Sequence, residues 1–288
     1  MIIRGFLITL FLFQFTAKAQ VPAPPNTIPF DSSLYVDKSE VANIHWLEYL
    51  HYVKKDSSDK FYKSCIPDTT LIIKFFPKGE VLNNADYIKI KEFRYFPIVG
   101  ISYQQAINYC KWRSEAVNIK WAQEKIIDTS EVKVQFRLPT IEEWIKIAYA
   151  GNYSVNITDS LSWEEDSLSA ILDNMGLLSD NTDENKLLLQ YFDNNPIHLV
   201  ENLKYKNVPT ALSGKLPMIF PATTVKKNAN YIYDLRGNVS EMTLTEGIAK
   251  GGNWKSTPGE IKLMDNVRYQ YPSELIGFRC VCEFIERE

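Results

Sequence analysis

Histidine and cysteine are scarce in this sequence, with three and four residues in a chain of 288. His45 and His51 are six positions apart, so on a helix they would point about 120° apart and could not share a metal. We expect them to have packing or surface roles. The phosphate-binding loop that ends in Lys-Ser/Thr, the serine nucleophile elbow and the His-Glu-x-x-His motif are also missing. These absences argue against several common classes of enzyme.

The sequence has no run of twenty apolar residues, so we expect no transmembrane segment. Its first part carries Arg4, an apolar run from Phe6 to Phe15 and a small-residue triplet before Gln20. This pattern predicts a cleavable signal peptide over residues 1–19 and therefore export. The first cysteine is Cys65, and a lipid-anchoring signal needs a cysteine at its cleavage point, so we expect no lipid anchor.

Clusters of basic residues are absent as well. The formal charge is −3, and loss of Arg4 and Lys18 with the signal makes the chain more acidic. Nucleic acid is therefore a poor candidate for a partner. Hydrophobic residues make up 45% of the chain and aromatic residues 13%, which is ample for a packed core of one large or two small domains.

The four cysteines belong to a chain that we expect to reach an oxidising compartment, where thiols usually pair. Three complete pairings are open to them. Cys280 and Cys282 are separated by one residue in a strand-like run. We expect their side chains to face opposite ways, which argues against a bond between them and against one shared metal.

The order of segments predicts one main domain. Residues 20–32 are proline-rich and are expected to form an extended tether, with the domain spanning 33–288. Residues 40–55 are predicted to be helical, with Ile44, Leu47, Leu50 and Val53 as the apolar face.

Two capping boxes predict two further helices. Ser102 and Gln105 begin the first, and Thr140 and Glu143 begin the second, for which Gly151 supplies the stop. The expected inward faces of the two helices are Ala106, Tyr109, Cys110 and Arg113, and Ile141, Trp144, Ile145 and Ala148.

Residues 152–215 are acidic and lack a clear period, so they are expected to form a long surface insert. From Pro217 onward, strands and turns are predicted in "MIFPATTV", "YIYDLRGNVSEMT", "IAKGGNWKS" and "IGFRCVCEFI". No internal repeat is present.

Asp234 and Glu241 surround a tight turn at Gly237, an arrangement that suits a hard cation such as calcium. From the residues alone, the favoured interpretation is structural. In that interpretation Asp234 caps the turn and Glu241 forms a surface ion pair.

Six motifs in order carry a family resemblance: "YVDKSEVANIHW", "PIVGISYQQAINYCKW", "FRLPTIEEWIKIAYAG", "YDLRGNVSEM", "AKGGNWKS" and "IGFRCV". They resemble the sulfatase-modifying-factor family, which comprises the formylglycine-generating enzymes and their relatives. The resemblance spans about Tyr35 to Val281 and fits the 152–215 insert poorly. It implies an α+β, C-type-lectin-like fold with much irregular structure.

The resemblance also implies roles for individual residues. It implies a disulfide between Cys110 and Cys280, which leaves Cys65 and Cys282 as a second pair. It implies possible calcium ligands at Asp234, the Gly237 and Val239 carbonyls, and Glu241. The family usually has Trp-Glu-Trp where this chain has Ser240-Glu241-Met242, so an aromatic wall of the usual cleft is missing.

The segment "GGNWKS" resembles the redox site of the oxidising family members. In them, a serine takes the place of Asn253, and cysteines that bind copper(I) take the places of Ser256 and Ile261. Hydroxyl and hydrocarbon groups do not replace thiolates as ligands for this soft ion, so copper is not expected. Lys255 and Ser256 are not expected to form a new catalytic pair, since adjacent strand residues face opposite ways.

The leading hypothesis is an exported, non-catalytic member of this family, a binding or structural module of the periplasm or outer membrane. Similar domains occur in lipoproteins of bacterial gliding motility and type IX secretion, so an envelope protein is the expected partner. Two alternatives stay open: a metal-dependent oxidase with an altered site, and a domain that binds carbohydrate or peptide through its sixteen tyrosines and six tryptophans.

Overall fold

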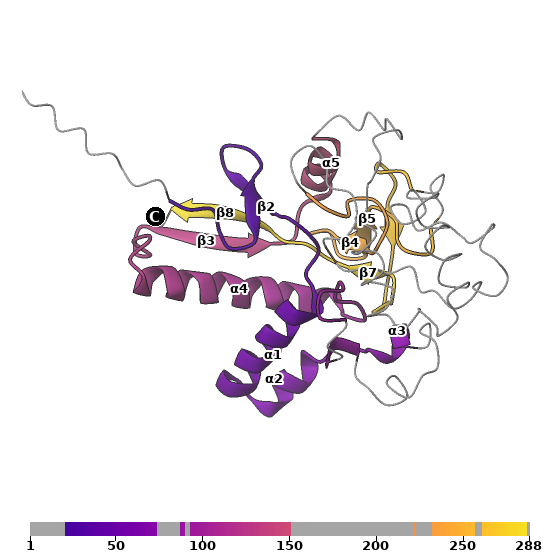
Figure 1. Ribbon diagram of the computed structural model, residues 1–288, viewed down its shortest axis with the longest axis horizontal. Helices are drawn as coiled ribbons and strands as arrows, with labels where there is room; N and C mark the ends of the chain where they lie inside the picture. Colours follow the sequence, from indigo (N-terminus) through magenta and orange to yellow (C-terminus); the bar gives the residue numbers. More distant parts are fainter. Residues whose placement is uncertain are drawn as a thin grey trace, which may run out of the picture.

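The computed structural model describes residues 21–73, 87–89, 93–150, 222, 232–256 and 261–286. The predicted signal peptide, Gly151, the whole predicted insert and, apart from Ala222, the predicted strand "MIFPATTV" lie outside these residues. Within them the fold contains two four-stranded sheets with helices packed beside them (Figure 1). The described part is therefore α+β, as the sequence predicted.

The first sheet joins the two ends of the described chain. Its strand order is β1-β2-β8-β3, and all its pairs are antiparallel. The strands are β1 (Thr27–Pro29), β2 (Leu34–Asp37), β3 (Val132–Arg137) and β8 (Val281–Glu286). β1 lies inside the segment 20–32 that was expected to be a tether. That expectation is wrong for this part, because three residues form ladder pairs with β2.

The second sheet holds the turn-rich segments in the order β6-β5-β4-β7. Its strands are β4 (Ser240–Met242), β5 (Ile248–Lys250), β6 (Val267–Arg268) and β7 (Ile276–Gly277). β4 and β7 pair in parallel, and the other pairs are antiparallel. This sheet fixes Glu241 opposite Lys250 and Gly277.

The helices are α1 (Asn43–Asp56), α2 (Asp59–Ser64), α3 (Thr70–Ile73), α4 (Tyr103–Gln123) and α5 (Ile141–Tyr149), with a 3₁₀ turn at Tyr87–Lys89. α4 runs along β3, and α1 and α2 lie on the far side of α4 (Figure 1). In this part of the chain, no helix is both long and apolar enough to cross a membrane.

Both predicted capping boxes are present. The Ser102 hydroxyl accepts from the Gln105 N–H at 3.2 Å, and the Gln105 side chain accepts from the Ser102 N–H at 2.7 Å. Thr140 and Glu143 make the same reciprocal pair at 3.1 and 2.8 Å. Each pair satisfies two backbone donors that have no partner inside the helix.

The inward face of α1 differs from the prediction. Leu50 and Val53 are buried as expected, but Ile44 is 37% exposed, and Trp46 and Tyr49 are buried instead. The two large rings pack against α4, where Trp46 stacks on Tyr109 with ring centroids 5.5 Å apart. The side of α1 that carries the two large aromatic rings therefore faces the core, because these rings bury the most apolar surface. For α4, the predicted face of Ala106, Tyr109, Cys110 and Arg113 is buried.

Two apolar clusters lie on the two faces of the first sheet. The larger cluster contains Cys280 and Cys282, whereas Val281 belongs to the smaller cluster with Trp144 and Val36. The expectation that the two cysteines face opposite ways is therefore wrong. Side chains alternate along a strand, so residues two apart share a face and the residue between them points away.

Candidate functional site

The segment Gly251–Ser256 forms a tight turn directly after β5. Gly251 and Gly252 have φ angles of 92° and 71°, a conformation that residues with a Cβ rarely adopt. The Gly251 carbonyl accepts from the Gly237 N–H at 2.8 Å, which binds this turn to the loop before β4. The two glycines therefore serve the backbone path, as the sequence indicated.

The polar groups of this turn hydrogen-bond to one another. Asn253 is 8% exposed, and its side chain donates to the Ser240 hydroxyl at 3.2 Å and accepts from the Lys255 N–H at 3.1 Å. Ser240 donates in turn to the Gly252 carbonyl at 2.7 Å. The Ser256 hydroxyl accepts from the Asn253 N–H at 3.2 Å. Asn253 and Ser256 are thus close together and are engaged in shaping the turn.

Ile261 closes the turn from the other side. It is 3% exposed, and its side chain lies against Gly252, where an added Cβ would stand 2.7 Å from Ile261 Cγ1. The position that the resemblance assigns to a second copper thiol is therefore filled by a buried hydrocarbon.

Trp254 and Lys255 face Glu274 on the loop before β7. The Trp254 indole donates to the Glu274 carbonyl at 2.9 Å, and Lys255 Nζ lies 2.8 Å from Glu274 Oε1. The same ammonium lies 4.8 Å from the centre of the Trp254 ring. Lys255 is thus held by an ion pair and a cation–π contact, a structural arrangement that does not pair it with Ser256.

Glu241 is the central residue of a group of buried charged and polar side chains near this turn. Its Oε2 accepts from Arg279 Nε at 2.6 Å and from the Trp144 indole at 2.7 Å, and its Oε1 pairs with Arg279 Nη2. Glu241 is 1% exposed and Arg279 is fully buried. Glu241 forms an ion pair, as the structural interpretation held, but the pair is in the core and not on the surface.

Two more buried carboxylates surround the same guanidinium. Glu40 is fully buried, and its Oε1 accepts from the Asn238 side chain at 3.2 Å. Burial, followed by the nearby Asp234 carboxylate, raises the pKa of Glu40 well above its ordinary value. Glu40, Asp234 and Glu241 together place three acidic groups near the Arg279 guanidinium.

The predicted calcium ligands fit that ion only in part. Among the described residues, no group of three or more histidines, cysteines or acids is arranged to hold a metal. Glu241 gives its oxygens to Arg279 and Trp144, so it does not fit as a ligand in this arrangement. Asp234 is 2% exposed and lies in the loop with Gly237 and Val239. It is near enough to Glu40 for its charge to raise the pKa of that residue. Calcium prefers carboxylate and backbone carbonyl oxygens as ligands.

The cysteines are four buried thiols in the structure. The sulfurs of Cys110 and Cys280 lie 3.6 Å apart, although the residues are separated by 170 positions in the sequence. Cys65 lies elsewhere, with its sulfur 3.1 Å from the Tyr49 hydroxyl, and the Cys282 sulfur faces the Glu283 carbonyl at 4.0 Å. The fold thus brings the first expected pair together and gives Cys65 and Cys282 different neighbours.

Sequence reasoning missed Glu40 and Arg279 as members of this site. Both lie inside motifs that carry the resemblance, "YVDKSEVANIHW" and "IGFRCV". For Arg279 the available signal was a charge among apolar, strand-like neighbours, because a charged residue there is rarely buried unless it is paired. Glu40 follows Asp37, Lys38 and Ser39, so no such signal marked it.

The two sheets, the helix α4 across β3 and the glycine turn after β5 define an α+β domain with a buried charge cluster around Arg279 near that turn. The chain belongs to the family of the sulfatase-modifying factor enzyme 1-like domain, which matches residues 11–284. No curated protein matches the chain.

Three solved structures are similar over most of the chain. CarF is 16% identical, with 87% of this chain and 86% of that chain covered and a TM-score of 0.45. Treponema denticola variable protein 1 is 13% identical, with 87% and 84% covered and a TM-score of 0.42. PvdO from Pseudomonas aeruginosa is 14% identical, with 87% and 80% covered and a TM-score of 0.46.

Proposed function

We propose that this chain is a non-catalytic member of its family that is exported and works as a binding or structural module of the bacterial cell envelope. The single observation that carries the proposal is the packing of Ile261 against Gly252, next to Asn253 and Ser256. Soft thiolate ligands are what copper(I) needs, and these positions offer an amide, a hydroxyl and a hydrocarbon.

The envelope role is supported by the predicted signal peptide and by the resemblance to domains of gliding-motility and type IX secretion lipoproteins. In such a machine the domain would contribute contact surfaces and no chemistry. The partner is an envelope protein in this proposal, and the chain reaches it in the periplasm or at the outer membrane.

Copper and peptide turnover test the non-catalytic part. The purified full chain is incubated with copper(I) and then with a cysteine-containing sulfatase peptide, and formylglycine is measured by mass spectrometry. We expect neither stoichiometric copper nor conversion. A matched variant carries Asn253→Ser, Ser256→Cys and Ile261→Cys together, and it is expected to gain copper binding. Copper or turnover in the unchanged chain would overturn the proposal.

Cross-linking of the tagged full chain in its native cells, followed by purification from the envelope fraction, tests the envelope role. A defined complex that forms in the envelope and is lost when residues 1–19 are deleted supports it. Recovery of the chain from the cytosol without an envelope partner contradicts it.

Calcium belongs to the proposal as a stabilising ion. Asp234 and the carbonyls of Gly237 and Val239 would hold it, and its charge would offset the buried carboxylates. Glu241 would not be a ligand of the ion, because its carboxylate is paired with Arg279.

A further inference from the structure

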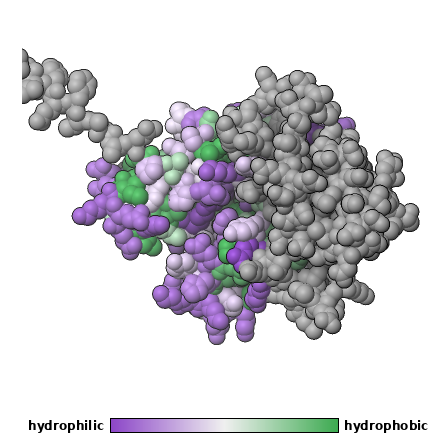
Figure 2. Space-filling view, in the orientation of Figure 1, coloured by the Kyte–Doolittle hydropathy of each residue, from purple (hydrophilic) through white to green (hydrophobic). Residues whose placement is uncertain are grey.

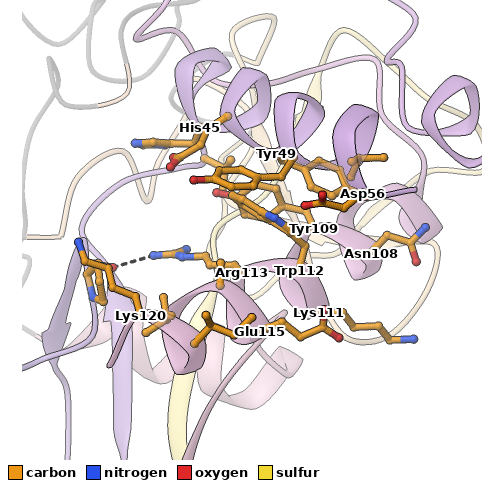
Figure 3. A pocket seen from close by; sticks show the side chains of 18 of the residues that line it. His45, Tyr49, Asp56, Asn108, Tyr109, Lys111, Trp112, Arg113, Glu115 and Lys120 are labelled. Atoms are coloured by element: carbon orange, nitrogen blue, oxygen red, sulfur yellow. Dashed lines mark hydrogen bonds between the residues drawn. The ribbon is translucent and has the colours of Figure 1, made fainter. Parts of the chain in front are cut away.

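A groove of about 1110 Å³ runs between α1 and α4, away from the Gly251–Ser256 turn (Figure 3). Its two long walls are helices, because most of its lining residues belong to α1 and α4. The lining on α4 runs from Asn108 to Gln123, so at a rise of 1.5 Å per residue this wall is about 23 Å long. The groove can therefore hold an extended ligand.

Both walls contribute aromatic rings, which contact one another across the groove. Trp112 has its ring centre 5.2 Å from Tyr49, 5.5 Å from Tyr109 and 5.9 Å from Tyr52. Tyr49 and Tyr109 are buried, whereas Tyr52 is 44% exposed and Phe61, also in the lining, is 38% exposed. Tyr52 is thus a partly exposed ring that is held by an aromatic layer, and Phe61 adds a second partly exposed ring to the lining.

Polar side chains of both kinds alternate with these rings. Glu48, Asp56 and Glu115 offer acceptors, and Lys111 and the Asn108 amide offer donors. Figure 3 shows Asp56, Asn108, Lys111 and Glu115 around the rings. Figure 2 likewise shows hydrophilic and hydrophobic residues interspersed over the described part of the surface. A ligand with many groups that both donate and accept matches such a lining.

The charged side chains of the groove include more acids than bases. At its floor, Arg113 and Asp37 form a buried bidentate pair with both contacts at 2.7 Å. Burial and then the Arg113 charge lower the pKa of His45, which keeps its ring neutral. The walls carry four acids, Glu48, Asp56, Glu115 and Glu124, against the two lysines Lys111 and Lys120. Anionic ligands are therefore disfavoured. A neutral ligand with many hydroxyl donors can pair with these carboxylates.

From the aromatic surface, the mixed donors and acceptors and the excess of carboxylate acceptors, we propose that the α1–α4 groove binds a neutral oligosaccharide. Sugar rings stack their apolar faces on Tyr52 and Phe61, and their hydroxyls, which both donate and accept, pair with the carboxylates and amides. This inference rests on the proposed function, because a domain without chemistry of its own acts through what it binds.

A peptide fits the groove less well. Two helical walls offer no strand edge to extend, and charged side chains interrupt the apolar surface that an amphipathic helix needs. The remaining mode is a proline-rich peptide on aromatic rings. Pro25 of this chain already lies at the end of the groove, where its carbonyl accepts from Arg113 at 2.9 Å. A peptide of sequence VPAPPNTIPF is therefore the matched competitor in the test.

The test is calorimetric titration of the full chain with chitohexaose, cellohexaose and maltohexaose at 0.15 M salt, each compared with the VPAPPNTIPF peptide. We expect at least one of the sugars to bind and the peptide not to bind. Tyr52→Ala and Asp56→Asn should each weaken sugar binding roughly tenfold, since each removes one contact. Tyr271→Ala, which removes a 72% exposed ring outside the groove, should change nothing.

Thermal midpoints of all variants are measured beside the titrations, because Tyr52 and Asp56 are exposed and their loss should leave folding intact. The proposal is overturned if none of the three sugars binds at millimolar concentration, if Tyr52→Ala and Asp56→Asn bind as the unchanged chain does, or if the peptide binds in their place. The groove variants leave the Gly251–Ser256 turn untouched. Failure here is therefore distinct from failure of the copper and turnover assay.

Discussion

The Ile261 side chain fills the space beside Gly252, because a Cβ added to Gly252 would stand 2.7 Å from Ile261 Cγ1. Gly252 also has a φ of 71°. Gly252→Ala should therefore cost about 1–3 kcal/mol in the free energy of unfolding, through backbone strain and the displacement of Ile261. Urea denaturation measures the loss.

Gly247→Ala is the matched control for this substitution. Gly247 has a φ of 80°, but the nearest atom to its added Cβ is 3.2 Å away. It shares the strain and lacks the severe clash, so Gly252→Ala should be the more destabilising of the two. Equal losses would show that Ile261 moves aside without cost.

The buried pair of Glu241 and Arg279 should be costly to break. Glu241→Gln leaves the fully buried guanidinium of Arg279 without the carboxylate that contacts it. Loss of one partner of such a pair typically costs about 3–5 kcal/mol. Glu124→Gln, which removes an exposed pair with Lys120 at 3.9 Å, should change stability by only about 0.5 kcal/mol. A loss below about 1 kcal/mol for Glu241→Gln, read by chemical denaturation, would contradict this account.

The thiols of Cys110 and Cys280 should join when the chain is exported. Their sulfurs are 3.6 Å apart and their separation of 170 residues makes a long loop. In the loop-entropy model such a bond adds about 5 kcal/mol. Peptide mapping under non-reducing conditions should find this bond, and reduction should lower the thermal midpoint. The family resemblance also implied a second bond, between Cys65 and Cys282. Because the structure gives each of these sulfurs other neighbours, the same map should find both of them as free thiols.

Local signals allowed a large part of the fold to be predicted. The capping boxes at Ser102 and Thr140 depend on residues three positions apart, and both helices begin there. The glycine turn after β5 could likewise be predicted from the sequence, because φ angles are a local property. The strand β1 was missed because its pairing with β2, and not its proline-rich composition, makes it a strand.

The charge cluster could not be predicted from local patterns. Glu40 and Arg279 are at opposite ends of the sequence, and only the fold places them together under the turn. The calcium interpretation of Glu241 used the spacing within one loop and could not anticipate a guanidinium from another segment. Burial of Trp46 and Tyr49 on α1 has the same origin, since their partner Tyr109 lies on α4.

Calcium should raise the thermal midpoint of the chain at pH 7.5 if it binds beside Asp234. An ion present at one hundred times its Kd adds about 2.7 kcal/mol to the free energy of unfolding. Asp234→Asn should abolish the calcium response. Asp128→Asn alters an acid of the exposed turn before β3 and should keep the response. No shift on addition of calcium or of a chelator would remove this ion from the proposal.

Glu40 should make stability depend on pH even without calcium. Burial raises its pKa in the folded chain well above the ordinary value of 4.5, Asp234 and Glu241 raise it further, and Arg279 opposes them. Above pH 4.5 the unfolded chain releases this proton while the folded chain keeps it. The free energy of unfolding should therefore fall as pH rises, by about 1.4 kcal/mol per pH unit, until the folded pKa is passed. Glu40→Gln keeps the contact with Asn238 and carries no charge, so urea denaturation from pH 5 to 8 should show a flatter profile for this variant. Parallel profiles would mean that Glu40 is ionised in the folded chain and that another cation balances it.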